Sequence, residues 1–368
     1  MAPGRGQLAL GHRGLMKIGI VCPYDLGVPG GVQQIAIELT QRLDDALLIG
    51  PGQVSGSVPV QFRSVGRARA VRANRSRAPI AMGPTAWTRT IRAIGEVDLV
   101  HVHEPFVPVV GWAALSLPYP TVATFHADPP RWMRRLYTAT AVAGAVWLGD
   151  AYPTAVSPVA AGGIPHRWRR PVIVPNAIDV SSYQVDVDRV QQRVIFLGRD
   201  DPRKGLDVLL RAWPAVMARH PGAELLVLGA DRPAVLHGVT FLGRVTEQEK
   251  QEMLGSGAIF VAPNKGAESF GLIVAEAMAA GCAVVASDIP AFKYVVGENG
   301  VLFPSGDAHA LSAELNILLD DRARIESLAG LGRAAVQRFD WTRVISQYMD
   351  VYESAIRGHA STIKGQKE

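Results

Sequence analysis

The chain has 368 residues, of which 48% are hydrophobic, and it carries a formal net charge of +5 at pH 7. This length exceeds what one compact core usually organises, so it favours two domains of ordinary size. Its two cysteines, Cys22 and Cys282, lie far apart in apolar contexts, which excludes a disulfide framework, and no apolar run is long enough to span a bilayer.

The first half of the chain predicts alternating strands and helices. Residues 1–15 make a poor signal peptide and are expected to be disordered. Whether translation starts at Met1 or at Met16 stays open. Continuous apolar runs then suit parallel strands that are buried on both faces. The expected strands are residues 17–22, 46–49, 58–62, 97–102, 121–125, 155–156 and 172–174, with a helix over residues 31–43.

The second half repeats this alternation. Strands are expected over residues 193–197, 224–228, 239–242, 258–261 and 283–286, with helices after Gly205, over 246–254, from about Phe270, and over 341–357. The pattern predicts two doubly wound α/β domains. We place them at residues 16–175 and 176–344, because Pro175 and Asn176 interrupt regular structure. Residues 345–358 are expected to cross back onto the first domain, and residues 359–368 to be disordered.

The positive charge is concentrated in the first half. Residues 1–175 hold 18 Lys and Arg against 9 Asp and Glu, whereas the remainder holds 20 against 24. The stretch from Gln61 to Arg77 contains six arginines and no acid, and we interpret it as a basic loop. It precedes an expected amphipathic helix over residues 84–95. Together they suit an anionic membrane surface, although the helix alone also fits a surface helix with solvated arginines. The candidate membrane residues are Arg63, Arg67, Arg69, Arg72, Arg75, Arg77, Trp87, Arg89 and Arg92.

Several chemical groups follow predicted strands, where open α/β sheets bind ligands. Gly31 begins a helix, where a glycine either lets a backbone approach an anion or forms a tight turn. Arg199 and Lys204 suit a diphosphate better than a solvated basic turn. His101 and His103 alternate along one strand and share a face, but no third ligand is evident. A structural or substrate-orienting role is therefore favoured over a metal site.

Two glutamates, Glu268 and Glu276, flank the start of a predicted helix. Glu268 lies just outside its N-terminus and Glu276 lies inside it. The free N–H groups of a helix N-terminus suit phosphate, whereas a carboxylate beside phosphate needs hydroxyl groups to accept from. The pair therefore indicates a sugar nucleotide, with sugar hydroxyls at one glutamate and ribose at the other. A capped helix with one buried, satisfied glutamate is the alternative.

Taken together, these motifs resemble the retaining glycosyltransferases of the GT-B fold in glycosyltransferase family four. The match extends from Met16 to about Gly358, and it is greatest with the bacterial phosphatidyl-myo-inositol mannosyltransferases. The resemblance implies two Rossmann-like domains that face a cleft. The motifs that carry it are Cys22-Pro23-Tyr24, Val28 to Gln33, His101 to Pro105, Ala123 to His126, Pro175-Asn176, Phe196 to Arg199, Pro202 to Gly205, and Ala262 to Glu276.

The resemblance also implies roles for individual residues. Gly31 would approach the donor diphosphate, and His126 would contact the transferred sugar. Arg199 and Lys204 would neutralise the leaving diphosphate. Glu268 would hold sugar hydroxyls and Glu276 the ribose, with Phe270 and Gly271 completing the donor site. The implied catalytic residues are His126, Arg199, Lys204 and Glu268, and the implied acceptor residues are Tyr24, Gln33, Asn74 and Arg131.

The reaction implied is retaining transfer of mannose from GDP-mannose to phosphatidylinositol by a cytoplasmic enzyme, peripheral at the inner face of the cell membrane. Fixed cations and helix-end amides would stabilise the charge that grows on the diphosphate. No cofactor is then required, stimulation by Mg2+ stays open, and no nucleic acid is expected. A covalent sugar intermediate and same-face attack by the acceptor hydroxyl are both conceivable. We favour same-face attack, because no well-placed carboxylate is evident near His126.

Departures from the subgroup lie near the acceptor side. After His126 the chain continues Ala127-Asp128-Pro129-Pro130-Arg131, where the subgroup is richer in small hydroxyl residues and carries lysine in place of Arg131. Two alternatives therefore stay open: a related glycosyltransferase with another nucleotide sugar or acceptor, and a non-catalytic sugar-nucleotide-binding protein. The intact cations and glutamates argue against the second.

Overall fold

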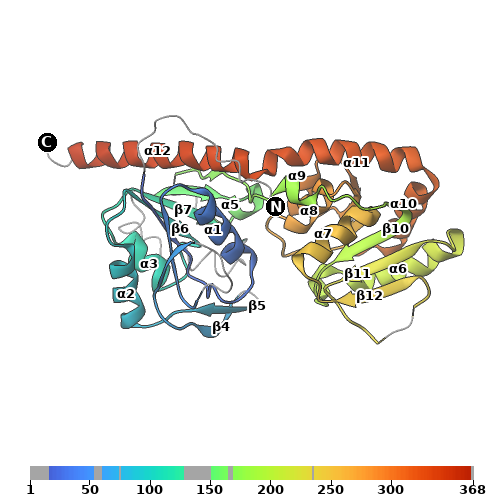
Figure 1. Cartoon of the computed structure of the whole chain (residues 1–368), viewed down its shortest axis with the longest axis horizontal. Coiled ribbons are helices and arrows are strands. Elements are labelled where there is room, and N and C mark those ends of the chain that lie inside the picture. The colour runs from blue at the N-terminus through green and yellow to red at the C-terminus, as the bar shows by residue number, and fades with distance from the viewer. Residues whose placement is uncertain are drawn as a thin grey trace. The chain divides into compact units, whose positions relative to one another are not determined.

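The computed structural model describes residues 16–53, 60–73, 76–127, 151–164, 169–233 and 236–365 (Figure 1). These residues fall into two compact units. The first unit lies within Met1–Phe125, Arg135–Pro153 and Met349–Glu368, and the second within His126–Arg134 and Thr154–Tyr348. Two parallel sheets with covering helices confirm the predicted pair of Rossmann-like α/β domains. The predicted domain limits stay a prediction.

The sheet that begins the chain has seven strands in the order β3-β2-β1-β6-β7-β8-β9. Neighbouring pairs from β3 to β7, and the pair β8–β9, are parallel. All residues of β1, β2, β6 and β7 are buried, which explains their continuous apolar sequences. The bounds are β1 Ile18–Val21, β2 Ala46–Gly50, β3 Gln61–Ser64, β6 Leu99–His103, β7 Thr121–Phe125, β8 Tyr152–Ala155 and β9 Val172–Ile173.

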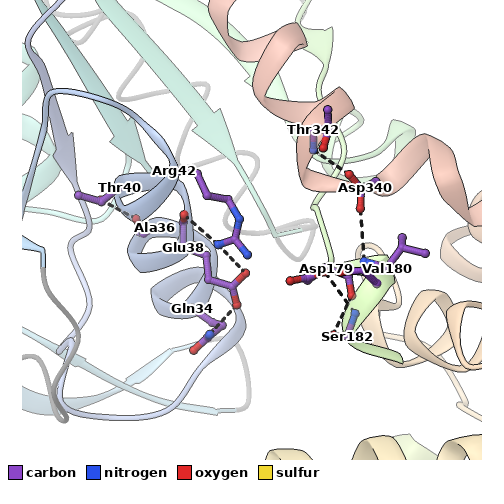
Figure 2. A network of polar contacts seen from close by, with 11 residues as sticks. Gln34, Ala36, Glu38, Thr40, Arg42, Asp179, Val180, Ser182, Asp340 and Thr342 are labelled. Carbon is purple, nitrogen blue, oxygen red and sulfur yellow. Dashed lines mark hydrogen bonds and ion pairs between the residues drawn. The ribbon is translucent and has the colours of Figure 1, made fainter. Parts of the chain in front are cut away.

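Helices α2 (Pro84–Ile94) and α3 (Val110–Leu115) share a core with alternate residues of β2 and β6, among them Leu47 and Val100. The helix α1 (Gly31–Arg42) packs against β1 and β2. On α1, Glu38 accepts a hydrogen bond from Gln34 Nε2 at 2.6 Å and pairs with Arg42 at 3.3 Å (Figure 2). These i, i+4 partners support the exposed side of the helix. The short helix α5 spans Pro158–Ala161.

The basic stretch is not the loop that we predicted. After β3, the strands β4 (Arg69–Ala73) and β5 (Ser76–Ile80) form an antiparallel hairpin with Arg72 opposite Arg77. Within β4 the arginines Arg69 and Arg72 are three residues apart, so they show no period of two that would indicate a strand. The sequence interpretation therefore followed the positive charge and missed the hairpin.

The second sheet has six parallel strands in the order β12-β11-β10-β13-β14-β15. Helices α6 and α10 share one core with alternate strand residues, among them Val194 and Val227. Helices α7, α8 and α11 also contact the sheet. The bounds are β10 Val190–Leu197, α6 Leu206–Arg219, β11 Glu224–Leu228, β12 Val239–Gly243, α7 Glu247–Ser256, β13 Gly257–Ala262, α8 Leu272–Ala279, β14 Ala283–Ser287, α9 Pro290–Val296, β15 Val301–Phe303, α10 Ala308–Asp320 and α11 Arg322–Val336.

The segment after β9 is tied to the start of the last helix, α12 (Trp341–Gly365). Asp340 accepts hydrogen bonds from the backbone N–H groups of Val180 at 3.3 Å and Thr342 at 2.9 Å (Figure 2). Asp179 caps the 3-10 turn η1 (Val180–Tyr183) by accepting from Ser182 N. These contacts set the position of Tyr183, which belongs to the site described below. The helix α12 extends beyond the predicted end at Arg357, because no proline follows to stop it.

Among the described residues, no helix combines the length and apolar character that crossing a membrane requires.

Candidate active site

Two loops at the carboxyl ends of β10 and β13 form the centre of the candidate site. Lys265 joins them, because its backbone N–H donates to the Arg203 carbonyl at 2.8 Å and its Nζ lies 2.7 Å from Asp207 Oδ2. Gly205 has a φ of 72°, and a Cβ there would lie 1.9 Å from the Pro263 carbonyl oxygen. Only glycine therefore allows the two loops to approach so closely.

Glu268 lies just outside the N-terminus of α8, as predicted. Its Oε2 accepts from Lys204 Nζ at 2.8 Å and from Asn264 Nδ2 at 3.0 Å. The preceding residue, Ala267, has a φ of 56°, which is strained for a residue with a Cβ. The loop therefore holds a carboxylate and an ammonium group together beside the N-terminus of α8.

The two predicted diphosphate cations differ in their surroundings. Lys204 is bound to Glu268, whereas Arg199 is exposed and forms no hydrogen bond or ion pair with any described residue. Arg203 is paired with Asp201, whose carboxylate also accepts from the Arg203 N–H. These hydrogen bonds lower the pKa of Asp201 to about 2. Of these three cations, only Arg199 thus has no carboxylate partner among the described residues, and Lys204 differs from Arg203 because its partner, Glu268, is itself a predicted sugar ligand.

Glu276 lies inside α8, as predicted, in a cluster that the sequence interpretation missed. Its Oε1 lies 3.0 Å from Lys250 Nζ, which also lies 2.8 Å from Glu247. The Tyr183 ring lies under the same ammonium group at 5.5 Å, and its hydroxyl donates to Glu247. Burial lowers the pKa of Lys250, but the neighbouring charges of Glu276 and Glu247 raise it overall. Thr246 and Glu249 form a capping box that marks the helix start and could have directed attention to Lys250.

The start of α8 has no side-chain cap. Its N-cap is Gly271, so no side chain there accepts from the first N–H groups of the helix. Phe270 is buried and packs against Phe339 and Tyr294. Phe270 therefore shapes the loop. At the other end of α8, Arg189 donates to the carbonyls of Gly257, Ala280 and Gly281.

His126 follows β7 and is 7% exposed. Burial lowers its pKa to about 4, and a hydrogen bond with the Asn176 side chain only partly opposes this effect. The imidazole is therefore neutral at neutral pH, with one nitrogen that donates and one that accepts. Such a group suits a sugar hydroxyl better than an anion.

The other two predicted histidines form a buried network in the first unit. His101 Nδ1 lies 2.8 Å from the Tyr352 hydroxyl, and its Nε2 lies 2.6 Å from Thr124 Oγ1. Its ring stacks on that of His103 at 4.4 Å, so both share one strand face as expected. Within the described ranges, no three His, Cys, Asp or Glu side chains gather as metal ligands would.

The acceptor-side candidates lie in the first unit or outside the described residues. Gln33 is buried in α1 and donates to the Asp25 carbonyl at 3.3 Å, and Tyr24 pairs with Ile80 through the backbone. Gly31 is exposed at the start of α1. Asn74, Arg75 and Arg131 lie outside the described residues.

The candidate membrane arginines also differ from one another. Arg67, Arg69, Arg89 and Arg92 are exposed. Arg63 donates to the Ala93 carbonyl at 2.8 Å and so supports the C-terminus of α2. Trp87 is half-buried on α2, whose fully buried residues include Ala86 and Ile94. The helix therefore presents arginines on its exposed side.

Comparison with known proteins agrees with this fold. Residues 29–182 match the family described as Glycosyltransferase Family 4, and residues 191–321 match that described as Glycosyl transferases group 1. The solved structure of Anabaena HepE in complex with UDP and glucose has a TM-score of 0.73 at 18% identity, covering 92% of this chain and 100% of that one. Sucrose-phosphate synthase from Thermosynechococcus elongatus has a TM-score of 0.68 at 19% identity, covering 92% and 98%. These two likenesses support the fold.

Relatives closer in sequence narrow the class. The phosphatidyl-myo-inositol mannosyltransferase of Mycobacterium tuberculosis (strain CDC 1551 / Oshkosh) is 36% identical over 92% of this chain and 97% of its own length. The enzyme of the same name from Propionibacterium freudenreichii is 35% identical over 94% and 97%. The chain therefore belongs to the family-four glycosyltransferases of the GT-B fold, and it is an enzyme of hexosyl transfer. Within that family it is similar to the phosphatidyl-myo-inositol mannosyltransferases.

Proposed function

We propose that the enzyme transfers mannose from GDP-mannose to phosphatidyl-myo-inositol with retention of anomeric configuration. The observation that carries the proposal is the near full-length similarity to enzymes named for mannosyl transfer to this lipid. The arrangement of Lys204, Glu268 and Glu276 supports it, because one carboxylate suits a sugar, the other suits a ribose, and cations suit the diphosphate between them.

In this proposal the sugar–phosphate bond breaks while negative charge grows on the diphosphate. Arg199 and Lys204 neutralise that charge, and the uncapped start of α8 adds backbone N–H groups. The acceptor hydroxyl attacks from the face that the diphosphate leaves, and a phosphate oxygen takes its proton. Neutral His126 contacts a hydroxyl of the sugar. No metal enters this scheme, because fixed cations supply the positive charge.

The membrane part of the proposal rests on the exposed arginines of the first unit. Arg67, Arg69, Arg89 and Arg92 would meet the anionic inner face of the cell membrane, where the lipid acceptor lies. The enzyme would then act as a peripheral protein, with a nucleotide sugar and a lipid as its ligands and no nucleic acid partner.

Transfer of radiolabelled mannose from GDP-mannose to phosphatidylinositol in anionic vesicles tests the proposal, with UDP-glucose as the parallel donor. We expect labelled lipid that an α-mannosidase cleaves and that Glu268→Ala abolishes. The matched control is Glu326→Ala, which removes an exposed carboxylate paired with Arg322 on α11. Labelled lipid resistant to the α-mannosidase would contradict retention. Release of free mannose without labelled lipid would refute phosphatidylinositol as the acceptor. Incorporation of sugar into the lipid only from UDP-glucose would refute GDP-mannose as the donor.

A further inference from the structure

The two carboxylate oxygens of Glu268 are not equivalent. Oε2 accepts both the Lys204 ammonium group and the Asn264 amide, whereas Oε1 accepts no hydrogen bond from any described residue. The side chain is 23% exposed, so Oε1 can meet a ligand. Oε2 of Glu268 thus already has two hydrogen-bond donors within the protein, whereas Oε1 is left to accept from a hydroxyl group of a ligand.

Asn264 is the rigid partner of the two. It is 1% exposed, and its backbone carbonyl accepts from the hydroxyls of Ser287 at 2.6 Å and Ser305 at 3.3 Å. Lys204 has a long side chain that is 24% exposed. Because long, partly exposed lysine side chains retain rotamer freedom, Asn264 fixes the position of the carboxylate more strongly than Lys204 does.

The orientation of the Asn264 amide follows from its neighbour. A carboxylate can only accept, so Nδ2 must face Glu268 and Oδ1 must face away from it. Oδ1 is then buried without a hydrogen-bond partner among the described residues. A buried unsatisfied carbonyl lowers the folding equilibrium constant roughly fivefold to 150-fold. An apolar side chain would avoid this cost, so the contact with Glu268 accounts for an amide at this place.

We propose that Asn264 is a positioning residue that keeps Glu268 in place while Lys204 engages the donor diphosphate. This inference rests on the proposed function, which assigns Lys204 to the diphosphate. A diphosphate carries more negative charge than a carboxylate, so it competes with Glu268 for the same ammonium group. Asn264 is neutral and buried, so it does not take part in that competition. Glu268 thereby retains one hydrogen-bond donor throughout, and its Oε1 stays directed at the sugar.

The partnership is tested by exchanging the amide and the carboxylate in a double-mutant cycle of unfolding equilibria. Asn264→Asp places two carboxylates together, and we expect it to raise the unfolding constant about tenfold or more. In the Glu268→Gln background an amide can again donate to a carboxylate, so Asn264→Asp should change the constant by less than about threefold. Equal effects in both backgrounds would overturn the partnership.

The positioning role is tested by separating binding from turnover. For Asn264→Ser, which leaves the charge of the site unchanged, we expect the Kd for GDP, measured by calorimetry, to stay within about twofold, because the neutral Asn264 amide donates to Glu268 and does not neutralise the diphosphate. Turnover of GDP-mannose should fall by roughly tenfold to a hundredfold, because the carboxylate that orients the sugar is displaced. The matched control is Asn299→Asp, which alters an amide that donates to the Val296 carbonyl and should keep wild-type turnover.

The possible failures are distinct. Wild-type protein that consumes neither GDP-mannose nor any other nucleotide sugar would refute the proposed function and, with it, the positioning role. Active wild-type protein whose Asn264 variants keep full turnover would refute the positioning role alone. A large loss of GDP affinity in Asn264→Ser would also refute it, because the residue would then act on nucleotide binding.

Discussion

Lys204 Nζ lies 2.8 Å from Glu268 Oε2, so the cation and the carboxylate from the two central loops form one ion pair. Their side chains are 24% and 23% exposed. Both side chains remain partly accessible to solvent, and Glu268 keeps its hydrogen bond from Asn264 when Lys204 is removed, so we expect the pair to contribute about 1 kcal/mol or less to stability. The pair is therefore better explained by a role in sugar transfer than by its contribution to folding. Activity and stability measurements can separate these two contributions.

Replacing Lys204 by methionine should lower transfer far more than stability. We expect kcat/KM for GDP-mannose to fall roughly a hundredfold to a thousandfold, which is the range seen when one group that stabilises transition-state charge is removed. The free energy of unfolding should change by less than about 1 kcal/mol. Steady-state kinetics and urea unfolding measure the two quantities. Arg322→Met, which breaks an exposed pair with Glu326, serves as the control and should change neither strongly.

Replacing Lys250, unlike replacing Lys204, should lower the stability of the protein markedly. Its side chain is 14% exposed and lies between Glu276 and Glu247, so Lys250→Met leaves a poorly hydrated Glu276 carboxylate without its counter-ion. Breaking one side of such a pair costs about 3 kcal/mol or more when it is fully buried, and we expect about 1–3 kcal/mol here. Urea unfolding would show the loss, and Glu276→Gln should reduce it when combined with Lys250→Met. Full additivity of the two changes would argue against a direct pair.

The loop before Glu268 contains two residues at positive φ, Gly266 at 128° and Ala267 at 56°. An L-residue at such angles costs about 1–2 kcal/mol, so Ala267→Gly should stabilise the protein by roughly 0.5–1 kcal/mol after the entropy of glycine is counted. Gly266→Ala should destabilise it by about 1–3 kcal/mol. A Cβ at Gly266 would meet no atom within 4 Å, so this effect reports on the backbone alone. Thermal unfolding of both variants measures the contrast, and a shift in the same direction for both would contradict it.

The sequence predicted the sheet strands well because their residues are buried on both faces. The strand Thr121–Phe125 and the strand Glu224–Leu228 match their predicted bounds, since a continuous apolar run admits few alternatives. The hairpin β4–β5 was missed, because its arginines indicated charge and do not alternate with a period of two. Most boundaries elsewhere shifted by one or two residues, as for β6, which ends at His103.

The site was only partly predictable for a related reason. Glu268, Glu276, Arg199 and Lys204 lie on motifs with fixed spacing, so sequence alone could single them out. The residues that pair with them do not lie at a fixed spacing in the sequence. Lys250 is 26 residues from Glu276, and Lys204 is 64 residues from Glu268, so only the folded chain brings them together. Asn264 lies close in sequence to Glu268, but nothing in a single sequence indicates which way a buried amide points.

Lowering the pH should destabilise the protein through His126. Its pKa is about 4 in the folded protein and about 6.5 when exposed, so the unfolded chain binds this proton more readily. The stabilisation is complete above about pH 6.5 and is lost as the pH falls toward 4, by about 3 kcal/mol at most. We expect His126→Gln to reduce the slope of unfolding free energy against pH in that window. An unchanged slope in urea unfolding at a series of pH values would contradict this assignment.

The exposed arginines of α2 and of the segment before it should control binding to anionic membranes. Near such a surface each arginine contributes about 1 kcal/mol, so removing two should weaken vesicle binding by roughly thirtyfold. We therefore expect Arg89→Gln with Arg92→Gln to lower affinity for phosphatidylinositol-containing vesicles, and added salt to narrow the difference. Arg322→Gln with Arg324→Gln on α11 removes the same net charge from the second unit and serves as the control. Both pairs should lose affinity equally if only net charge matters, whereas a selective loss for the α2 pair would place the membrane contact on the first unit. Cosedimentation with vesicles at low and high salt measures this, with neutral vesicles as the reference for binding that is not electrostatic.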